Sequence, residues 1–275
     1  MLARVVAVTL SLFVAADLGK ATSIVVDVTS DGIIVLADSR AEDSSSTAPR
    51  DDQCKIAILG PNLIFAETGN EGYKPSVSTD WVPEWHGTAE AVKAYILVKS
   101  HSLDDVALQW SLQLTENFKI FYRADPKRVR ELARLSWGNL VVGIFAGKDS
   151  SGKMRALVAR VALDDTLIER ENVLIPIGHA ISEIPVDRQP YSTNGVTQEL
   201  LDGKTDRALA VAELWVKSSR HVPKRDRQLR RLEFMIEQTA NYDEGVHPPV
   251  NAALVTTTSS IWLQNKTCQS PHSPC

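Results

Sequence analysis

The sequence predicts an α+β fold, a four-layer αββα sandwich in which helices cover the outer faces of two stacked sheets. Short β-branched runs joined by tight turns fill the opening of the chain, and strand patterns return in the middle and at the end. Helical periodicity fills the two segments between them. This order suits layered sheets and not repeated βαβ units. The 275 residues, 44% of them apolar, are enough for one embellished domain or two small ones.

The opening of the chain has the pattern of two hairpins. A dense β-branched run is followed by a Ser-Asp-Gly turn and a second apolar run, and a Gly-Pro turn separates the next two runs. The segment between the hairpins is polar and serine-rich, so we expect a loop there. The expected strands cover residues 23–28, 33–37, 55–59 and 62–66.

Helices are expected after an irregular stretch at 71–87. Ser102 predicts an N-cap, because acidic residues in the following turn complement the positive end of a helix. The Asp-Pro pair at 125–126 predicts the start of another helix. The first group of expected helices covers residues 89–99, 102–122 and 126–135.

Strand and helix patterns alternate once more through the second half. Apolar runs predict strands in the middle and at the end of the chain, and helical spacing predicts two helices between them. The expected strands cover 140–146, 156–162, 173–177, 250–256 and 261–263, and the expected helices cover 205–217 and 225–241.

The first 21 residues have the pattern of an export signal. A short basic start precedes an apolar run at 5–16, which falls short of the about 18–20 residues that a stable membrane anchor needs. Small residues allow cleavage before Asp17 or before Thr22. We therefore expect a leader at 1–21, a periplasmic or extracellular protein and no stable membrane span. The alternative is that this segment is a buried first strand or helix of a cytoplasmic protein.

Several short motifs occur in register after the leader. They are Thr-Ser-Ile-Val at 22–25, Asp-Gly at 31–32, Asp-Ser-Arg-Ala at 38–41, Lys-Ile at 55–56 and Ala-Glu-Thr-Gly at 66–69. In these motifs and their spacing the chain resembles the β-type subunits of the proteasome, which are N-terminal nucleophile hydrolases. The resemblance implies a domain at 22–265 followed by a tail at 266–275.

The resemblance also implies a role for each of four residues. Thr22, freed as the first residue, would be the nucleophile, and its own α-amine, with a pKa of about 8, would accept the hydroxyl proton. Lys55 would lower the pKa of its neighbours, and Asp38 would hold Lys55 in place. The backbone N–H of Gly69 would stabilise the oxyanion. Such an enzyme would cleave an amide bond, in the first place a peptide bond, through a threonine acyl-enzyme.

The later part of the chain departs from the family's pattern. Asp243 matches the aspartate of a late Arg-Asp-x-x-Ser-Gly-Gly motif, but Val246 stands at its serine and His-Pro-Pro at 247–249 replaces the glycines. A strand end with glycine and serine is also expected, and Ile-Gly-His at 177–179 lies near that place without the serine. These departures concern the hydrogen bonds that tune the terminal amine. An inactive subunit with a structural or binding role, or an amidase for small molecules, are the alternatives.

The residue two positions before the family's glycine lines its first specificity pocket, and here this residue is Glu67. An acidic pocket floor would favour substrates with Lys or Arg beside the cleaved bond. The alternative is that Glu67 points elsewhere.

Other ligands are not indicated. The net charge of −4 predicts no nucleic-acid partner, and the histidines show no metal-ligand spacing, so no metal or other cofactor is expected. The family assembles through its helices, which leaves a homo-oligomer open. Cys268 and Cys275 could close a small tail loop, and Cys54 could pack beneath the site.

Overall fold

The computed structural model describes residues 22–29, 31–40, 54–69, 72–73, 85–167, 174–185 and 189–268. The predicted leader at 1–21 and the last part of the predicted tail, 269–275, lie outside the described residues. Among the described residues, no helix is both long and apolar enough to cross a membrane.

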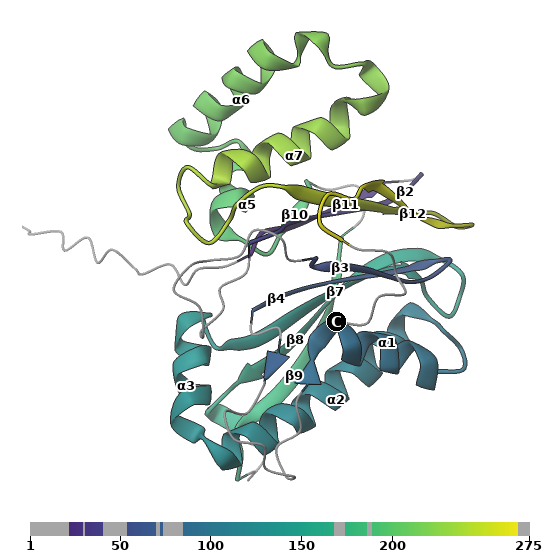
Figure 1. The fold of residues 1–275 in the computed structure, drawn as a ribbon, viewed down its shortest axis with the longest axis vertical. Coiled ribbons are helices and arrows are strands. Elements are labelled where there is room, and N and C mark those ends of the chain that lie inside the picture. The colour runs from purple at the N-terminus through teal and green to yellow at the C-terminus, as the bar shows by residue number, and fades with distance from the viewer. Residues whose placement is uncertain are drawn as a thin grey trace, which may run out of the picture.

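Two five-stranded antiparallel sheets form the centre of the molecule (Figure 1). The first sheet has the order β10 (Tyr191–Ser192), β1 (Ile24–Thr29), β2 (Gly32–Asp38), β11 (Val250–Val255) and β12 (Ser260–Gln264). The second has the order β3 (Ile56–Gly60), β4 (Leu63–Gly69), β7 (Asn139–Lys148), β8 (Met154–Leu163) and β9 (Ile177–Ile184). A small pair, β5 (Gly72–Tyr73) and β6 (Trp85–His86), lies outside both sheets.

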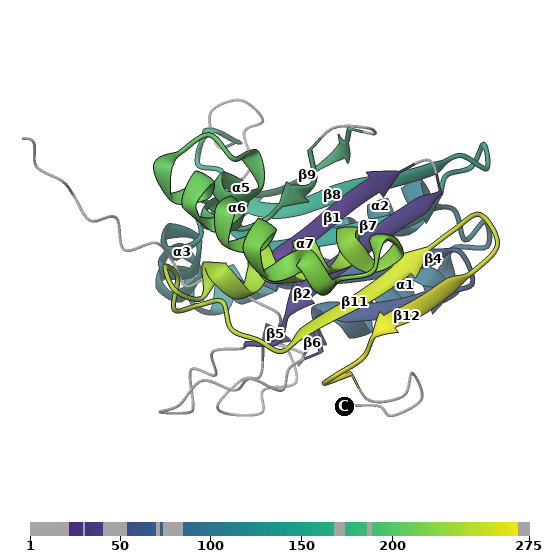
Figure 2. The same cartoon turned by 90° about the horizontal axis from the view of Figure 1, so that it is seen from above.

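Helices cover the outer face of each sheet. Figure 1 shows one group beside the second sheet, formed by α1 (Gly87–Leu97), α2 (Leu103–Ala124) and α3 (Pro126–Leu135). The other group lies over the first sheet and consists of α5 (Gly195–Asp202), α6 (Asp206–Ser218) and α7 (Arg227–Thr239). Seen from above, α7 lies across the strands of the first sheet (Figure 2). Two short 3₁₀ turns, Ser219–His221 and Lys224–Asp226, connect α6 to α7.

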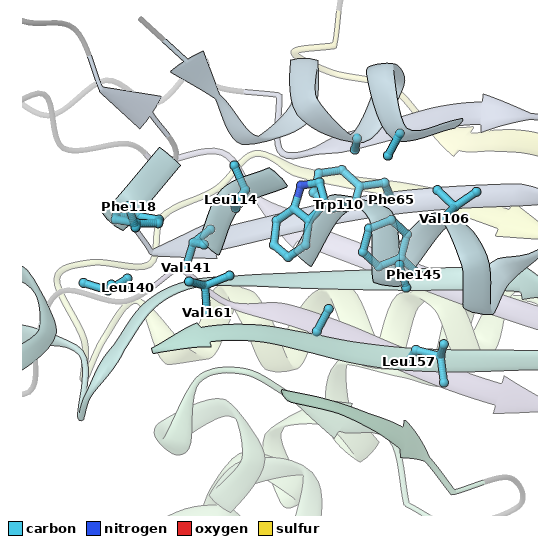
Figure 3. Packing of buried hydrophobic residues seen from close by; sticks show 14 of the residues in the cluster. Phe65, Val106, Trp110, Leu114, Phe118, Leu140, Val141, Phe145, Leu157 and Val161 are labelled. Atoms are coloured by element: carbon cyan, nitrogen blue, oxygen red, sulfur yellow. The ribbon is translucent and has the colours of Figure 1, made fainter. Parts of the chain in front are cut away.

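Three apolar cores separate these layers. Beneath α2, the Trp110 ring packs against Phe65 and Phe145, with ring centroids 5.5 Å and 5.6 Å away (Figure 3). A second core lies between the two sheets, and a third lies between the first sheet and α5–α7. Because strand residues alternate between faces, each sheet supplies side chains to two cores.

The predicted helix starts follow from their caps. Ser102 accepts a hydrogen bond from the Asp105 N–H at the start of α2, and Asp125 caps α3 in the same way. The structure thus confirms the three helices expected before residue 136.

The strand expected at 173–177 is wrong, because β9 begins only at Ile177. Residues 179–183 of β9 are exposed at a sheet edge, so this strand lacks the apolar pattern that indicates a buried strand.

Candidate active site

The register of the first sheet brings the start of β1 beside the end of β2. Ile24 pairs with Ala37 in antiparallel register, so Ser23, just before β1, lies opposite Asp38, the last residue of β2. The Asp38 N–H donates to the Ser23 carbonyl at 3.2 Å. Lys55 comes from the second sheet, where it directly precedes β3. The ends of three strands from two sheets therefore meet at Thr22.

Lys55 joins the predicted nucleophile to the predicted aspartate. Its Nζ lies 2.6 Å from the Thr22 Oγ1 and 3.4 Å from the nearer carboxylate oxygen of Asp38. The same ammonium donates to the Arg40 carbonyl. The exposed fractions of Thr22, Asp38 and Lys55 are 9%, 0% and 1%. In such surroundings charges interact more strongly than at the surface.

Asp38 is held by the backbone of three different segments. One carboxylate oxygen accepts from the Ser23 N–H at 2.9 Å, and the other from the N–H groups of Arg40 at 3.1 Å and His247 at 3.3 Å. Burial raises the pKa of this carboxyl above its ordinary value, while the Lys55 ammonium and the three N–H donors oppose that rise. The carboxylate is fixed in position, so it can orient the ammonium.

The backbone of Thr22 is held from both sheets. Its carbonyl accepts from the Thr193 hydroxyl at 3.2 Å and from the Thr68 hydroxyl at 3.5 Å. The Thr193 hydroxyl oxygen also accepts from the Ile24 N–H at 3.0 Å. These contacts leave the Thr22 side chain directed at Lys55.

Asp243 reaches the site through Asn194. The Asn194 amide donates to one carboxylate oxygen at 2.7 Å, and the Gly245 N–H donates to the other at 2.9 Å. Asn194 is also the N-cap of α5, since its side chain accepts from the Thr197 N–H at 3.0 Å. Val246, at the family's serine position, is 0% exposed and packs in the core under α5–α7.

Gly69 ends β4 with a φ of +99°, a value that favours glycine. A Cβ at this position would also come within 3.1 Å of the Leu140 carbonyl oxygen. The residue lines a pocket of about 420 Å³ whose walls include Thr68, Thr193, Asn194 and Asp243. Gly69 is therefore close to the residues that hold Thr22.

Glu67 lies in β4, and its side chain contacts the start of α1. Its carboxylate accepts from the Thr88 N–H at 2.9 Å and from the Thr88 hydroxyl at 2.5 Å, and His86 Nδ1 is 3.6 Å away. The residue is 1% exposed. Pairing with a basic substrate would require this carboxylate to become accessible, and that role stays a prediction.

The structure does not bring residues 177–179 to Thr22. His179 pairs with Val161 inside the second sheet, and its ring contacts Thr115 of α2. Thr193 contacts Thr22 instead, and Asn194 beside it contacts Asp243; the sequence pattern predicted neither residue. The signal was an asparagine followed by an apolar pattern at helical spacing, which marks the start of α5.

The cysteine pairing differs from the expectation. Cys54 and Cys268 form a disulfide, with Cα atoms 4.7 Å apart, so the loop expected between Cys268 and Cys275 is wrong. The bond ties the residue before Lys55 to the segment after β12. Cysteines 214 positions apart in the sequence give no local signal of pairing.

The described part of the chain contains no group of three His, Cys, Asp or Glu side chains arranged to hold a metal ion. Comparison of the sequence with models of known protein families and with curated proteins finds no match.

Proposed function

We propose that this protein is an N-terminal nucleophile hydrolase that cleaves amide bonds, in the first place peptide bonds, with Thr22 as its nucleophile. The observation that carries the proposal is the position of the Lys55 Nζ, 2.6 Å from the Thr22 hydroxyl and 3.4 Å from Asp38. A buried cation between a hydroxyl and a carboxylate favours loss of the hydroxyl proton. Local sequence does not force these three residues together.

The first half-reaction would form an ester. The Thr22 Oγ attacks the amide carbonyl carbon while its proton moves to the α-amine, which is free once the leader has been removed. The Gly69 N–H stabilises the oxyanion, and one such donor contributes about 3–4 kcal/mol. The C–N bond then breaks, the leaving amine takes the proton from the α-ammonium, and the acyl group stays on the Thr22 oxygen.

Water completes the cycle. It gives a proton to the α-amine as it attacks the ester carbonyl, and the C–O bond to Thr22 breaks with return of that proton to the hydroxyl. The products are a carboxylic acid and the free enzyme. Asp38 holds Lys55 beside the Thr22 oxygen, and no metal or organic cofactor takes part in this scheme.

The proposal requires that Thr22 become the first residue. Signal peptidase cleaving before Thr22 would expose it directly, and cleavage before Asp17 would leave five residues to be removed by self-cleavage. Either route fits an exported protein, in the periplasm or outside the cell. The oxidised Cys54–Cys268 pair supports this location, since disulfides persist in oxidising compartments.

One observation favours an inactive subunit with a structural or binding role. The hydroxyl of the late motif is replaced by Val246, whose side chain lies in an apolar core, so it supplies no hydrogen bond to a terminal amine. In that case Lys55 and Asp38 would be a buried ion pair without a reaction to serve. An amidase for small molecules would share the mechanism and differ only in substrate.

The test combines the mature N-terminus with active-site labelling. Mass spectrometry of the exported protein should find Thr22 as the first residue, and a β-lactone probe should form an ester with it. Thr22→Ala should not be labelled, and Thr22→Ser should be. A mature protein that begins at Asp17, or a Thr22 terminus that the probe does not label, would overturn the enzyme proposal.

A further inference from the structure

The pocket beside Thr22 has walls from both sheets. Thr68 and Thr193, which both donate to the Thr22 carbonyl, form part of it. The opposite parts of the wall come from β7, β8 and the turn before β7, through Val142, Arg160 and Trp137. Its volume of about 420 Å³ lies within the range of small-molecule sites.

Arg160 occupies a position of β8 on the face that otherwise carries apolar residues. Ala156 and Val158 of β8 pack into the core between the sheets, and strand alternation puts Arg160 on the same inner face. Its cross-strand partner Val142 packs against that core as well. Arg160 is half-buried and lines the pocket, so its guanidinium lies at the pocket wall.

The contacts of Arg160 leave most of its donors available. Within the described part of the chain, its one hydrogen-bond partner is the Tyr191 hydroxyl, at a long 3.4 Å, and no carboxylate lies within ion-pair distance. Asp243, an acidic residue of the same pocket, accepts a hydrogen bond on each oxygen, from Asn194 and from Gly245, and forms no ion pair with Arg160. The pocket therefore offers a cation with free donors, and a guanidinium binds a planar carboxylate through two parallel hydrogen bonds.

The rim of the pocket carries an exposed aromatic ring. Trp137 is 78% exposed and has a φ of +55°, which is strained for a bulky residue. Strain of this kind gathers at functional sites, and an exposed indole next to a pocket supplies apolar contact for a ligand.

We propose that this pocket binds a carboxylate group of the substrate through Arg160, with Trp137 packing on the apolar part of the same group. The inference rests on the proposed function and names its substrate class: amides with an acidic side chain or a free carboxylate next to the cleaved bond. Thr68 and Thr193, which line the pocket, both donate to the Thr22 carbonyl, so a bound group would lie next to the Thr22 backbone.

The test uses two ligands of the same shape and different charge. N-acetylglutamate α-amide and N-acetylglutamine α-amide are titrated into the mature protein, and binding is followed by tryptophan fluorescence. Wild type should bind the acidic ligand about 10-fold or more tightly than the neutral one, the range expected for hydrogen bonds to a charged group. Equal affinities would overturn the inference.

The variants locate the effect. Arg160→Gln should abolish the preference for the acidic ligand and Arg160→Lys should keep part of it, because a lysine retains the charge without the paired donors. Arg155→Gln makes the same charge change on the opposite face of β8 and should keep the preference. Trp137→Phe should remove the fluorescence change. A preference that survives Arg160→Gln, or a signal that survives Trp137→Phe, would place the ligand elsewhere and overturn the inference.

Peptide hydrolysis tests the carboxylate pocket separately from the activity of Thr22. Two internally quenched peptides that differ only in Glu or Gln beside the cleaved bond should differ about 10-fold or more in kcat/KM, and Arg160→Gln should remove the difference. If the β-lactone labels Thr22 but neither assay shows an acidic preference, only the carboxylate pocket is refuted. If Thr22 is not labelled but the acidic ligand binds selectively, the hydrolase fails and the pocket stands.

Discussion

The candidate site combines an early segment, which carries Thr22, Asp38 and Lys55, with a late segment, and the two contribute in different ways. The early segment supplies side chains: the Thr22 hydroxyl, the Lys55 ammonium and the Asp38 carboxylate contact one another. In the late segment, 243–249, the Asp243 side chain bonds Asn194, but the contacts with the early residues are made by the backbone. The His247 N–H donates to Asp38, and the Pro249 carbonyl accepts from the Ser39 hydroxyl at 2.7 Å.

Substitutions in the two segments have different consequences for the site. A backbone N–H or carbonyl is present whatever the side chain, so changes of residue type at 246–249 preserve these contacts. Changes in the early segment remove the reacting groups themselves. The departures of the late segment from the proteasome pattern therefore weaken the enzyme proposal less than a change at Lys55 would.

The largest effect is expected at Lys55. Lys55→Met should lower the rate of Thr22 labelling about a thousandfold or more, because the charge beside the nucleophile is lost. It should also destabilise the fold by about 3–5 kcal/mol, since Asp38 is left buried without its cation. Labelling kinetics and urea unfolding measure the two effects.

A second substitution separates these effects. Asp38→Asn together with Lys55→Met removes both charges, so the double variant should regain much of the stability and none of the labelling. Labelling that persists in Lys55→Met would break the comparison, because the early side chains would then not matter more than the late backbone.

The Cys54–Cys268 bond joins the early segment to the end of the chain and should contribute the next largest effect. Replacing both cysteines by serine should lower the free energy of unfolding by about 2–5 kcal/mol. Reductant should destabilise the wild type by a similar amount and leave the double variant unchanged. Unfolding curves that do not move with reductant would show that the link between the segments is not formed.

Val246 tests whether side-chain identity matters within the late segment. Val246→Ser restores the family's residue type but puts a hydroxyl into an apolar core, which should cost about 1–3 kcal/mol. Labelling of Thr22 should not improve. If the serine variant reacts faster than wild type, then side-chain identity in the late segment matters and the backbone interpretation fails. Val246→Ala, which adds no hydroxyl, is the matched control.

The smallest effect is expected outside the candidate site, at Glu233 on α7. Burial would raise the pKa of this carboxyl, but hydrogen bonds from Lys266, Gln264 and Arg230 hold it below the ordinary 4.5. A lowered folded-state pKa means that the stabilisation is present above pH 4.5 and is lost as the pH falls through the folded value. Glu233→Gln should therefore cost about 1 kcal/mol at pH 7, and less in acid.

Glu237, one turn further along α7, is the matched control. Burial and the neighbouring Glu233 raise its pKa, so its charge opposes folding at neutral pH. Glu237→Gln should not lower stability at pH 7, and thermal melts at two pH values compare the pair. Equal losses in both variants would show that the contacts of Glu233 with the end of β12 carry no specific stabilisation.

The sequence was sufficient to predict the elements with strong local signals. Ser102 and Asp125 marked helix starts because a cap acts within one turn, and the hairpins of residues 24–38 and 56–69 followed from β-branched runs around turn residues. It also singled out Thr22, Asp38 and Lys55, through motifs at short spacing.

Tertiary packing alone set the contacts between distant segments. It paired Cys54 with Cys268, set Asn194 against Asp243, tied Glu67 to Thr88 and put Arg160 on an inner face beside Thr22's pocket. The physical reason is that periodicity and capping depend on neighbours within one or two turns. Which strand ends meet across two sheets depends on how whole layers pack.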